Sequence, residues 1–127
     1  MTDDAQKRAI SATHREVADR FTALSPAIRG CAIIAPGEPA GTSSSDDKGW
    51  IEAGRALLGA ADSAAGETAT HAHVATEEGE AYAIRQGDLA MVAVTDRFTL
   101  ASLVLADMRA ALRVAARADQ LATAKAA

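Results

Sequence analysis

Two histidines two positions apart form the pair in this chain most suggestive of chemistry. His71 and His73 lie in a stretch of strand length, and alternate residues of a strand point to the same face, so both imidazoles can face one metal ion. A catalytic zinc site needs a third protein ligand and a structural site needs four. The remaining candidates, Cys31, Glu77 and Glu78, have no standard spacing relative to this pair. We therefore expect no metal site, and we favour histidines on a solvated or subunit-facing side of a strand.

The other residue types used in catalysis are not arranged for it. Asp46-Asp47 and Glu77-Glu78 are adjacent carboxylates that point apart, whereas a general acid and base must converge on one substrate. The aspartates suit a helix start and the glutamates flank a turn. The serine run lacks the elbow sequence of a nucleophile, and Cys31 sits in an apolar run, where a buried thiol is inert. The glycine-containing turn after that run has neither the spacing nor the lysine of a phosphate-binding loop. We expect no catalytic centre and no cofactor.

Composition limits the protein to one modest domain. Its 127 residues are 49% hydrophobic but only 3% aromatic, so alanine-rich helices can pack closely while each buried residue contributes little area. A net charge of -4 argues against binding to a nucleic-acid backbone. No apolar run approaches the roughly 18 residues that span a membrane. A single cysteine and a start without a basic and then apolar leader predict a cytoplasmic protein.

Hydrophobic periodicity predicts eight elements around one interior strand. Residues 89–94 are apolar on both faces of a strand, so both faces must be covered. A Pro-Gly turn predicts a first hairpin, and two glycine-containing turns join three further strands into a meander. We expect residues 1–117 to form one domain and residues 118–127 a frayed or disordered tail. The predicted elements are a helix over 3–24, strands over 29–35 and 40–44, a helix over 47–64, strands over 69–76, 80–85 and 88–95, and a helix over 98–117.

This order of elements carries a resemblance together with particular residues. The residues are Leu24-Ser-Pro-Ala-Ile-Arg-Gly30 before an apolar strand, a Pro-Gly turn followed by small residues, and the block from Tyr82 to Leu112. Over residues 18–114 the chain resembles the roadblock/LC7 family, which includes roadblock-type dynein light chains and bacterial small-GTPase regulators. The turn Pro36-Gly37-Glu38-Pro39 departs from the Asp-Gly turn common in that family. The resemblance implies an α+β fold in which helices sandwich a five-stranded antiparallel sheet, in the order α-β-β-α-β-β-β-α of profilin-like folds.

The resemblance also implies where partners bind. Family members look like small homodimers in which the second helix and the third strand of each subunit meet their counterparts. On this sequence, we expect the partner or dimer interface at Trp50, Glu52, Gly54, Arg55, Leu58, His71 and His73. Trp50 has two interpretations of equal weight, because a tryptophan at helical spacing covers a sheet as a core residue or anchors an interface.

Two functions from different classes fit these observations. Many family members regulate or scaffold Ras-like GTPases and are not usually enzymes, so the leading interpretation is a noncatalytic homodimeric regulator or adaptor of a small GTPase or signalling assembly. The alternative is a small-ligand sensor of PAS-like or profilin-like architecture, by analogy of fold alone. A sensor needs a closed apolar pocket between the sheet and a helix, and an adaptor does not.

Overall fold

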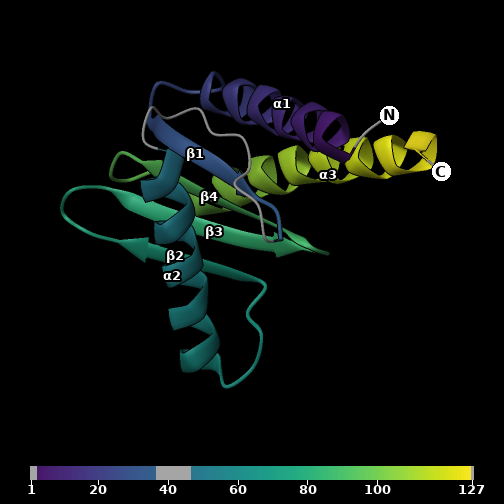
Figure 1. The fold of residues 1–127 in the computed structure, drawn as a ribbon. Coiled ribbons are helices and arrows are strands. Elements are labelled where there is room, and N and C mark those ends of the chain that lie inside the picture. The colour runs from purple at the N-terminus through teal and green to yellow at the C-terminus, as the bar shows by residue number, and fades with distance from the viewer. Residues whose placement is uncertain (1–2, 37–46, 127) are drawn as a thin grey trace.

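The structure is a computed structural model that describes residues 3–36 and 47–126 (Figure 1). The predicted strand over 40–44 lies outside these residues, so the described sheet has four strands instead of five. The elements are α1 (Asp3–Thr22), β1 (Ile28–Ile34), α2 (Asp47–Ala65), β2 (His71–Ala75), β3 (Glu80–Gln86), β4 (Leu89–Thr95) and α3 (Ala101–Ala126). No helix within the described ranges is long and apolar enough to span a bilayer.

The sheet is antiparallel with the strand order β1-β4-β3-β2. β4 is the interior strand that its two apolar faces predicted, since it pairs with β1 on one side and β3 on the other. Gly87 makes the tight β3–β4 turn with a φ of 59°, a left-handed conformation that glycine adopts without steric cost. β2 lies at one edge and pairs only with β3 among the described strands.

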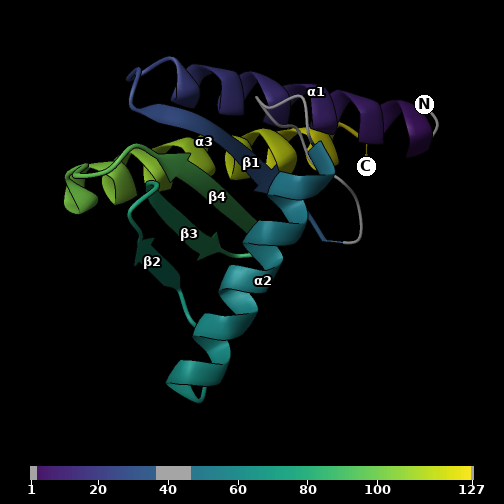
Figure 2. The ribbon, with the colours of Figure 1, turned by 90° about the vertical axis from the view of Figure 1, so that its left-hand side faces the viewer.

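Helices cover both faces of this sheet, which makes three layers (Figures 1 and 2). α1 and α3 lie side by side on one face, above a core whose largest fully buried side chains include Phe21, Tyr82, Met91, Met108 and Leu112. Among the described helices, α2 alone crosses the other face. The core beneath it is smaller and consists of Ala32, Ile34, Ile51 and Val92.

α2 lies close to the sheet because one of its glycines permits the approach. A Cβ atom on Gly54 would stand 2.8 Å from Ile34 Cδ1 and 3.0 Å from Val92 Cβ, closer than packed carbon atoms normally come. Gly59, one turn further on, has nothing within 4 Å of such a Cβ. Glycine lowers helix stability, and the close packing at Gly54 is the compensation expected for it.

The C-terminal segment differs from the prediction. Residues 118–126 continue α3 as helix, whereas a frayed tail was expected from residue 118. The segment packs against α1, where the Asp119 carboxylate lies 2.8 Å from Nε2 of His14 and the Gln6 amide reaches the Ala122 carbonyl at 3.5 Å. These partners stand more than 100 residues earlier in the chain, so a local pattern could not reveal them.

Candidate functional site

The predicted interface centres on α2 and the neighbouring edge strand β2. At the start of α2, Trp50 is half-buried and packs against Gly30 of β1. A Cβ on Gly30 would stand 2.8 Å from Trp50 Cζ2, so the absence of a side chain at Gly30 makes room for the indole. Trp50 therefore does cover the sheet, and the remainder of its ring is open to solvent. Both interpretations of this residue keep a structural basis.

Two of the predicted interface residues lie inside the protein and need correction. Gly54 is buried against β1 and β4, and the side chain of Leu58 is 3% exposed. Both belong to the apolar stripe by which α2 packs on the sheet. Neither can offer atoms to a partner in this structure, and a charge at Leu58 would act first on folding.

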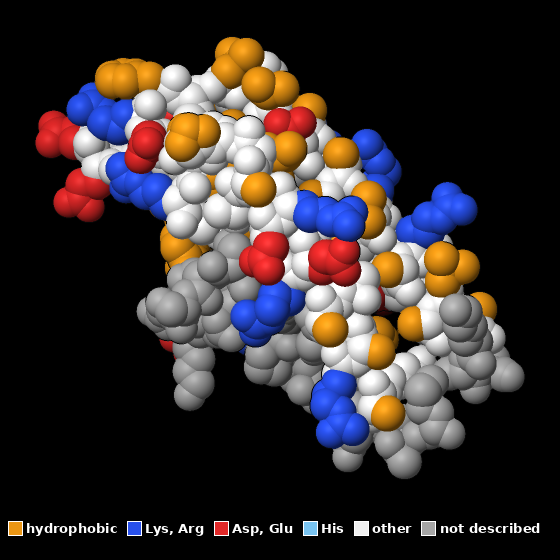
Figure 3. Space-filling model, turned by 90° about the horizontal axis from the view of Figure 1, so that it is seen from above, with side chains coloured by type: hydrophobic (Ala, Val, Ile, Leu, Met, Phe, Trp, Pro, Cys, Tyr) orange, Lys and Arg blue, Asp and Glu red, His pale blue; other side chains and the backbone are white. Residues whose placement is uncertain are grey.

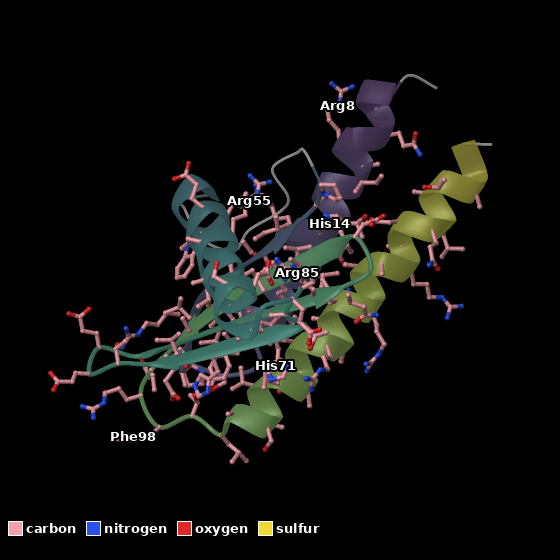
Figure 4. All side chains as sticks on the ribbon, turned by 90° about the horizontal axis from the view of Figure 1, so that it is seen from below. Arg8, His14, Arg55, His71, Arg85 and Phe98 are labelled. Atoms are coloured by element: carbon pink, nitrogen blue, oxygen red, sulfur yellow. The ribbon has the colours of Figure 1, made fainter. Side chains whose placement is uncertain are left out.

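Glu52 and Arg55 are exposed on α2, as an interface requires, and Figure 4 shows Arg55 projecting from the helix. Further along, α2 and β2 border a shallow hollow of about 520 Å³. Its lining is mostly small and apolar, with Leu57, Ala60 and Ala64 from α2 and Val74 from β2. Val74 is 43% exposed. The surface beside α2 is thus largely apolar and lies next to β2, whose outer edge pairs with no other described strand.

The register of β2 with β3 directs the side chains of His71 and His73 to the face of the sheet opposite α2, while both residues also border the hollow between α2 and β2. In β2, His73 pairs with Tyr82 and His71 with Ile84, and both partners belong to the core under α1 and α3. Directly opposed residues of an antiparallel pair point to the same face. The His73 ring stacks on Tyr82 with centroids 4.3 Å apart, and its Nε2 lies 2.8 Å from Glu80 Oε1. His71 is exposed and makes no comparable contact.

Glu80 organises a polar cluster that the sequence did not indicate. Its carboxylate is buried and accepts two hydrogen bonds of 2.8 Å from Thr99, one from the hydroxyl and one from the backbone N–H, in the loop before α3. These bonds, the hydroxyl first, and the contact with His73 lower the pKa of Glu80 to about 2. The cluster fixes β3, β2 and the start of α3 to one another.

A second charged contact ties α2 to the sheet. Arg85 of β3 donates to both carboxylate oxygens of Asp62, at 2.7 and 2.9 Å, and to the Ala69 carbonyl at 2.8 Å. The hydrogen bond from Arg85 is the main cause of a lowered pKa at Asp62, followed by the bond from the Ala69 backbone N–H. Figure 4 shows Arg85 beside α2. This fork fixes the C-terminal half of the helix that carries the predicted interface.

Phe98 is an exposed residue that the prediction missed. It lies in the loop between β4 and α3 (Figure 4), its side chain is 85% exposed, and its φ of 63° is unusual for an aromatic residue. The Arg97 guanidinium lies 4.6 Å from the ring centroid. Both residues line an open hollow of about 550 Å³ together with Glu77, Glu80 and Thr99.

The side chains at the α2 side of the sheet divide into contacts that hold the fold together and residues that stay exposed. Within residues 3–36 and 47–126, no group of three or more His, Cys, Asp or Glu side chains is placed to hold a metal ion. The tight polar contacts of Glu80 and Arg85 are satisfied inside the fold and join elements. On the α2 side of the sheet, the outer face of α2, the rim of Trp50 and the outer edge of β2 remain exposed for contact with a partner.

Comparison with known proteins gives one informative result. No protein-family model matches the sequence, and no curated protein matches it. Among solved structures, Myxococcus xanthus MglB, a roadblock/LC7 protein, aligns with a TM-score of 0.66 at 14% identity, over 87% of this chain and 90% of that chain. The chain has a roadblock-like fold. This confirms, for the fold, the resemblance inferred from the order of elements and from the block between Tyr82 and Leu112.

Proposed function

We propose that this protein is a noncatalytic homodimeric regulator or adaptor that acts on a Ras-like small GTPase or a signalling assembly. The observation that carries the proposal is the roadblock-like fold, because MglB is a GTPase-activating regulator of the roadblock/LC7 family. The surface chemistry supports it, since the outer face of α2 offers contact residues without a catalytic constellation. A regulator of this kind needs a docking surface and no reaction centre of its own.

The dimer would form about a two-fold axis through β2 and α2. An edge strand with free backbone groups can pair with a copy of itself, and the symmetry makes such an interface self-complementary. Val74 and the alanines of α2 that line the neighbouring hollow would be covered by the second copy. The small side chains allow the two helices to approach closely.

Light scattering tests the dimer directly. We expect a particle of twice the 13.0 kDa chain mass at micromolar concentrations, and a monomer for Val74→Asp. Leu100→Asp is the matched control, because Leu100 is 66% exposed in the loop before α3, outside β2 and α2, and the same charge there should leave the dimer intact. A wild-type particle of 13.0 kDa throughout that range would refute the dimer.

The action on a GTPase would rely on docking and not on an inserted arginine. Arginine fingers need a rigid, exposed platform near the nucleotide. Arg55 lies in the middle of a helix, and Arg97 lies at a strand–helix junction against the Phe98 ring. We infer that the protein orders the switch loops of the GTPase or simply holds it, with Trp50 as an anchor and Glu52 and Arg55 at the rim.

The deciding experiment measures binding and single-turnover hydrolysis with purified Ras-like GTPases from the same organism, loaded with GDP or a GTP analogue. Trp50→Ala should weaken binding by about 2 kcal/mol or more while light scattering still reports the dimer. Arg55→Ala should leave any stimulated hydrolysis in place. A loss of about a thousandfold in stimulation with binding intact would establish an arginine finger, and no binding by any of these GTPases would refute the proposal.

The sensor alternative gains no support from the core. A sensor would keep its ligand between the sheet and a helix, and under α1 and α3 that space holds Phe21, Tyr82, Met91, Met108 and Leu112, each fully buried. Side chains packed at this density leave no room for a ligand of some hundreds of Å³. We therefore advance one function.

A further inference from the structure

The outer face of the α1–α3 layer contains an apolar groove. It runs between the two helices and has a volume of about 340 Å³. Buried Val17 and Phe21 form its floor, and Leu24 and Val114, which are 62% and 57% exposed, stand at its sides. Figure 3 views this face and shows hydrophobic side chains exposed among charged ones. A groove of this kind, with large aliphatic side chains left open to water, is characteristic of a docking site.

A row of arginines follows the other side of α3. Arg109, Arg113 and Arg117 recur every four residues, so they lie along one side of the helix and all three are exposed. None of them has a carboxylate within ion-pair distance in the part of the chain that the structure describes. By contrast, Arg20 and Arg85 each have one, in Glu16 and Asp62.

This row is unexpected in a chain of net charge -4. Like charges four residues apart on a helix destabilise it by a few tenths of a kcal/mol per pair. An open hollow of about 500 Å³ borders the row and is lined by Arg113, Arg117 and Leu121. The unpaired guanidinium groups are therefore accessible to an acidic partner, and an acidic partner would remove their mutual repulsion.

The groove and the arginine row flank the same strip of α3. Ala110 and Val114 line the groove, and the row lies on the other side of this strip. We propose that the α1–α3 face binds an amphipathic helix of a partner protein. Large apolar side chains of that helix would enter the groove, and its acidic residues would face Arg109, Arg113 and Arg117. A helix laid into a groove and anchored at three- and four-residue steps is an established mode of recognition.

Two other occupants fit the surface less well. An anionic membrane is a broad surface, and the apolar floor of the groove is recessed where a membrane needs protruding side chains. A second copy related by a two-fold axis would present the same concave groove, and two concave surfaces leave a gap between them. An acidic amphipathic helix complements the shape of the groove and the charge of the arginine row.

This face is separate from the surface proposed for the GTPase. α1 and α3 cover one side of the sheet and α2 covers the other (Figures 1 and 2). A helix bound between α1 and α3 would leave α2 and the free edge of β2 accessible. The inference does not depend on the proposed function, and it would add a second attachment point to an adaptor.

The test uses a pair of designed helical peptides and the full chain. The acidic peptide has about 21 residues in three heptads, with leucine at positions a and d and glutamate at e and g, where like charges prevent self-pairing. Its matched control carries lysine in place of glutamate. Fluorescence anisotropy should show the acidic peptide binding at least tenfold more tightly than the basic peptide at low salt, with a marked loss at about 1 M salt, where charges are screened.

Variants locate the site. Arg113→Glu with Arg117→Glu should reduce acidic-peptide affinity at least tenfold, and Val114→Asp should do the same by placing a charge at the groove. Arg55→Glu with Arg97→Glu makes an equal change in net charge elsewhere and should have little effect beyond a general weakening of about twofold.

Three results would overturn the proposal. They are equal binding of the two peptides, no saturation up to about 1 mM, and tight binding that the groove and arginine variants leave unchanged. Vesicles rich in phosphatidylserine provide the membrane comparison. Vesicle binding that is lost in the double arginine variant, without binding of the acidic peptide, would assign the face to a membrane and refute the helix.

Discussion

Gly54 and Gly59 occupy the same helix, and the structure predicts opposite responses to the same substitution. Gly59→Ala adds a methyl group that meets nothing within 4 Å. Gly54→Ala adds one that must stand 2.8 Å from Ile34 Cδ1 and 3.0 Å from Val92 Cβ. Alanine is favoured over glycine in a helix interior in both places, so only the packing differs.

The magnitudes follow from these two effects. Replacing glycine by alanine in a helix stabilises by about 1 kcal/mol, and this is the whole effect expected for Gly59→Ala. Overpacking a close contact costs about 1–3 kcal/mol, so Gly54→Ala should range from neutral to about 2 kcal/mol less stable than the wild type. The two variants should therefore differ by about 1–3 kcal/mol.

Urea unfolding followed by circular dichroism at the helix band measures this difference. With a slope of about 1–3 kcal/mol per molar urea for a small protein, the midpoints should be separated by roughly 1 M. Gly54→Ala should also weaken any partner binding through Trp50, because α2 must move away from the sheet. Equal stabilisation by the two substitutions would show that α2 does not depend on a close approach at Gly54.

Three further predictions rest on single contacts. Glu80→Gln should lower stability at neutral pH, because the ionised Glu80 carboxylate, whose pKa is lowered to about 2, stabilises the fold fully above pH 4.5. The difference in melting temperature from wild type should shrink as the pH falls from 4.5 towards 2. A difference that stays constant over this range would contradict the prediction. Asp119→Ala removes the carboxylate that lies 2.8 Å from His14 Nε2. The His14 ring is 1% exposed and its Nδ1 has no hydrogen-bond partner among the described residues, so this substitution should lower the free energy of unfolding by about 1–3 kcal/mol. A loss near zero in urea unfolding would show that the contact is not formed in solution. Gly30→Ala should displace the Trp50 indole towards water and shift its fluorescence to longer wavelength, whereas unchanged emission would place the ring elsewhere.

The elements were predictable because their signals are local. The alternation from Leu89 to Val94 indicated a strand with two covered faces, and Met91 and Val92 do lie in the two separate cores. The resemblance placed Gly54 and Leu58 of α2 at an interface, whereas both pack on the sheet of their own chain. Small and apolar residues on a helix look alike in sequence whether they cover a core or a partner.

The faces and long-range contacts were not predictable in the same way. A two-residue spacing indicates that His71 and His73 share a face, but only their register with β3 decides which face, and that register places them on the side of α3. Residues 118–126 look patternless, and they are helical where Asp119 meets His14. The arginine row was visible as a spacing, yet its lack of ion-pair partners depends on the packing of α3.

The pairing of α1 with α3 and of β1 with β4 has a consequence for synthesis of the chain. Both contacts join the beginning of the described sequence to its end, so β1 gains its sheet partner only after β4 is made, and the apolar side of α1 with Val17, Phe21 and His14 stays uncovered until α3 emerges. Contacts so distant in sequence slow folding and expose apolar surface to aggregation in the meantime. A nascent chain should therefore complete this fold only after α3 has left the ribosome.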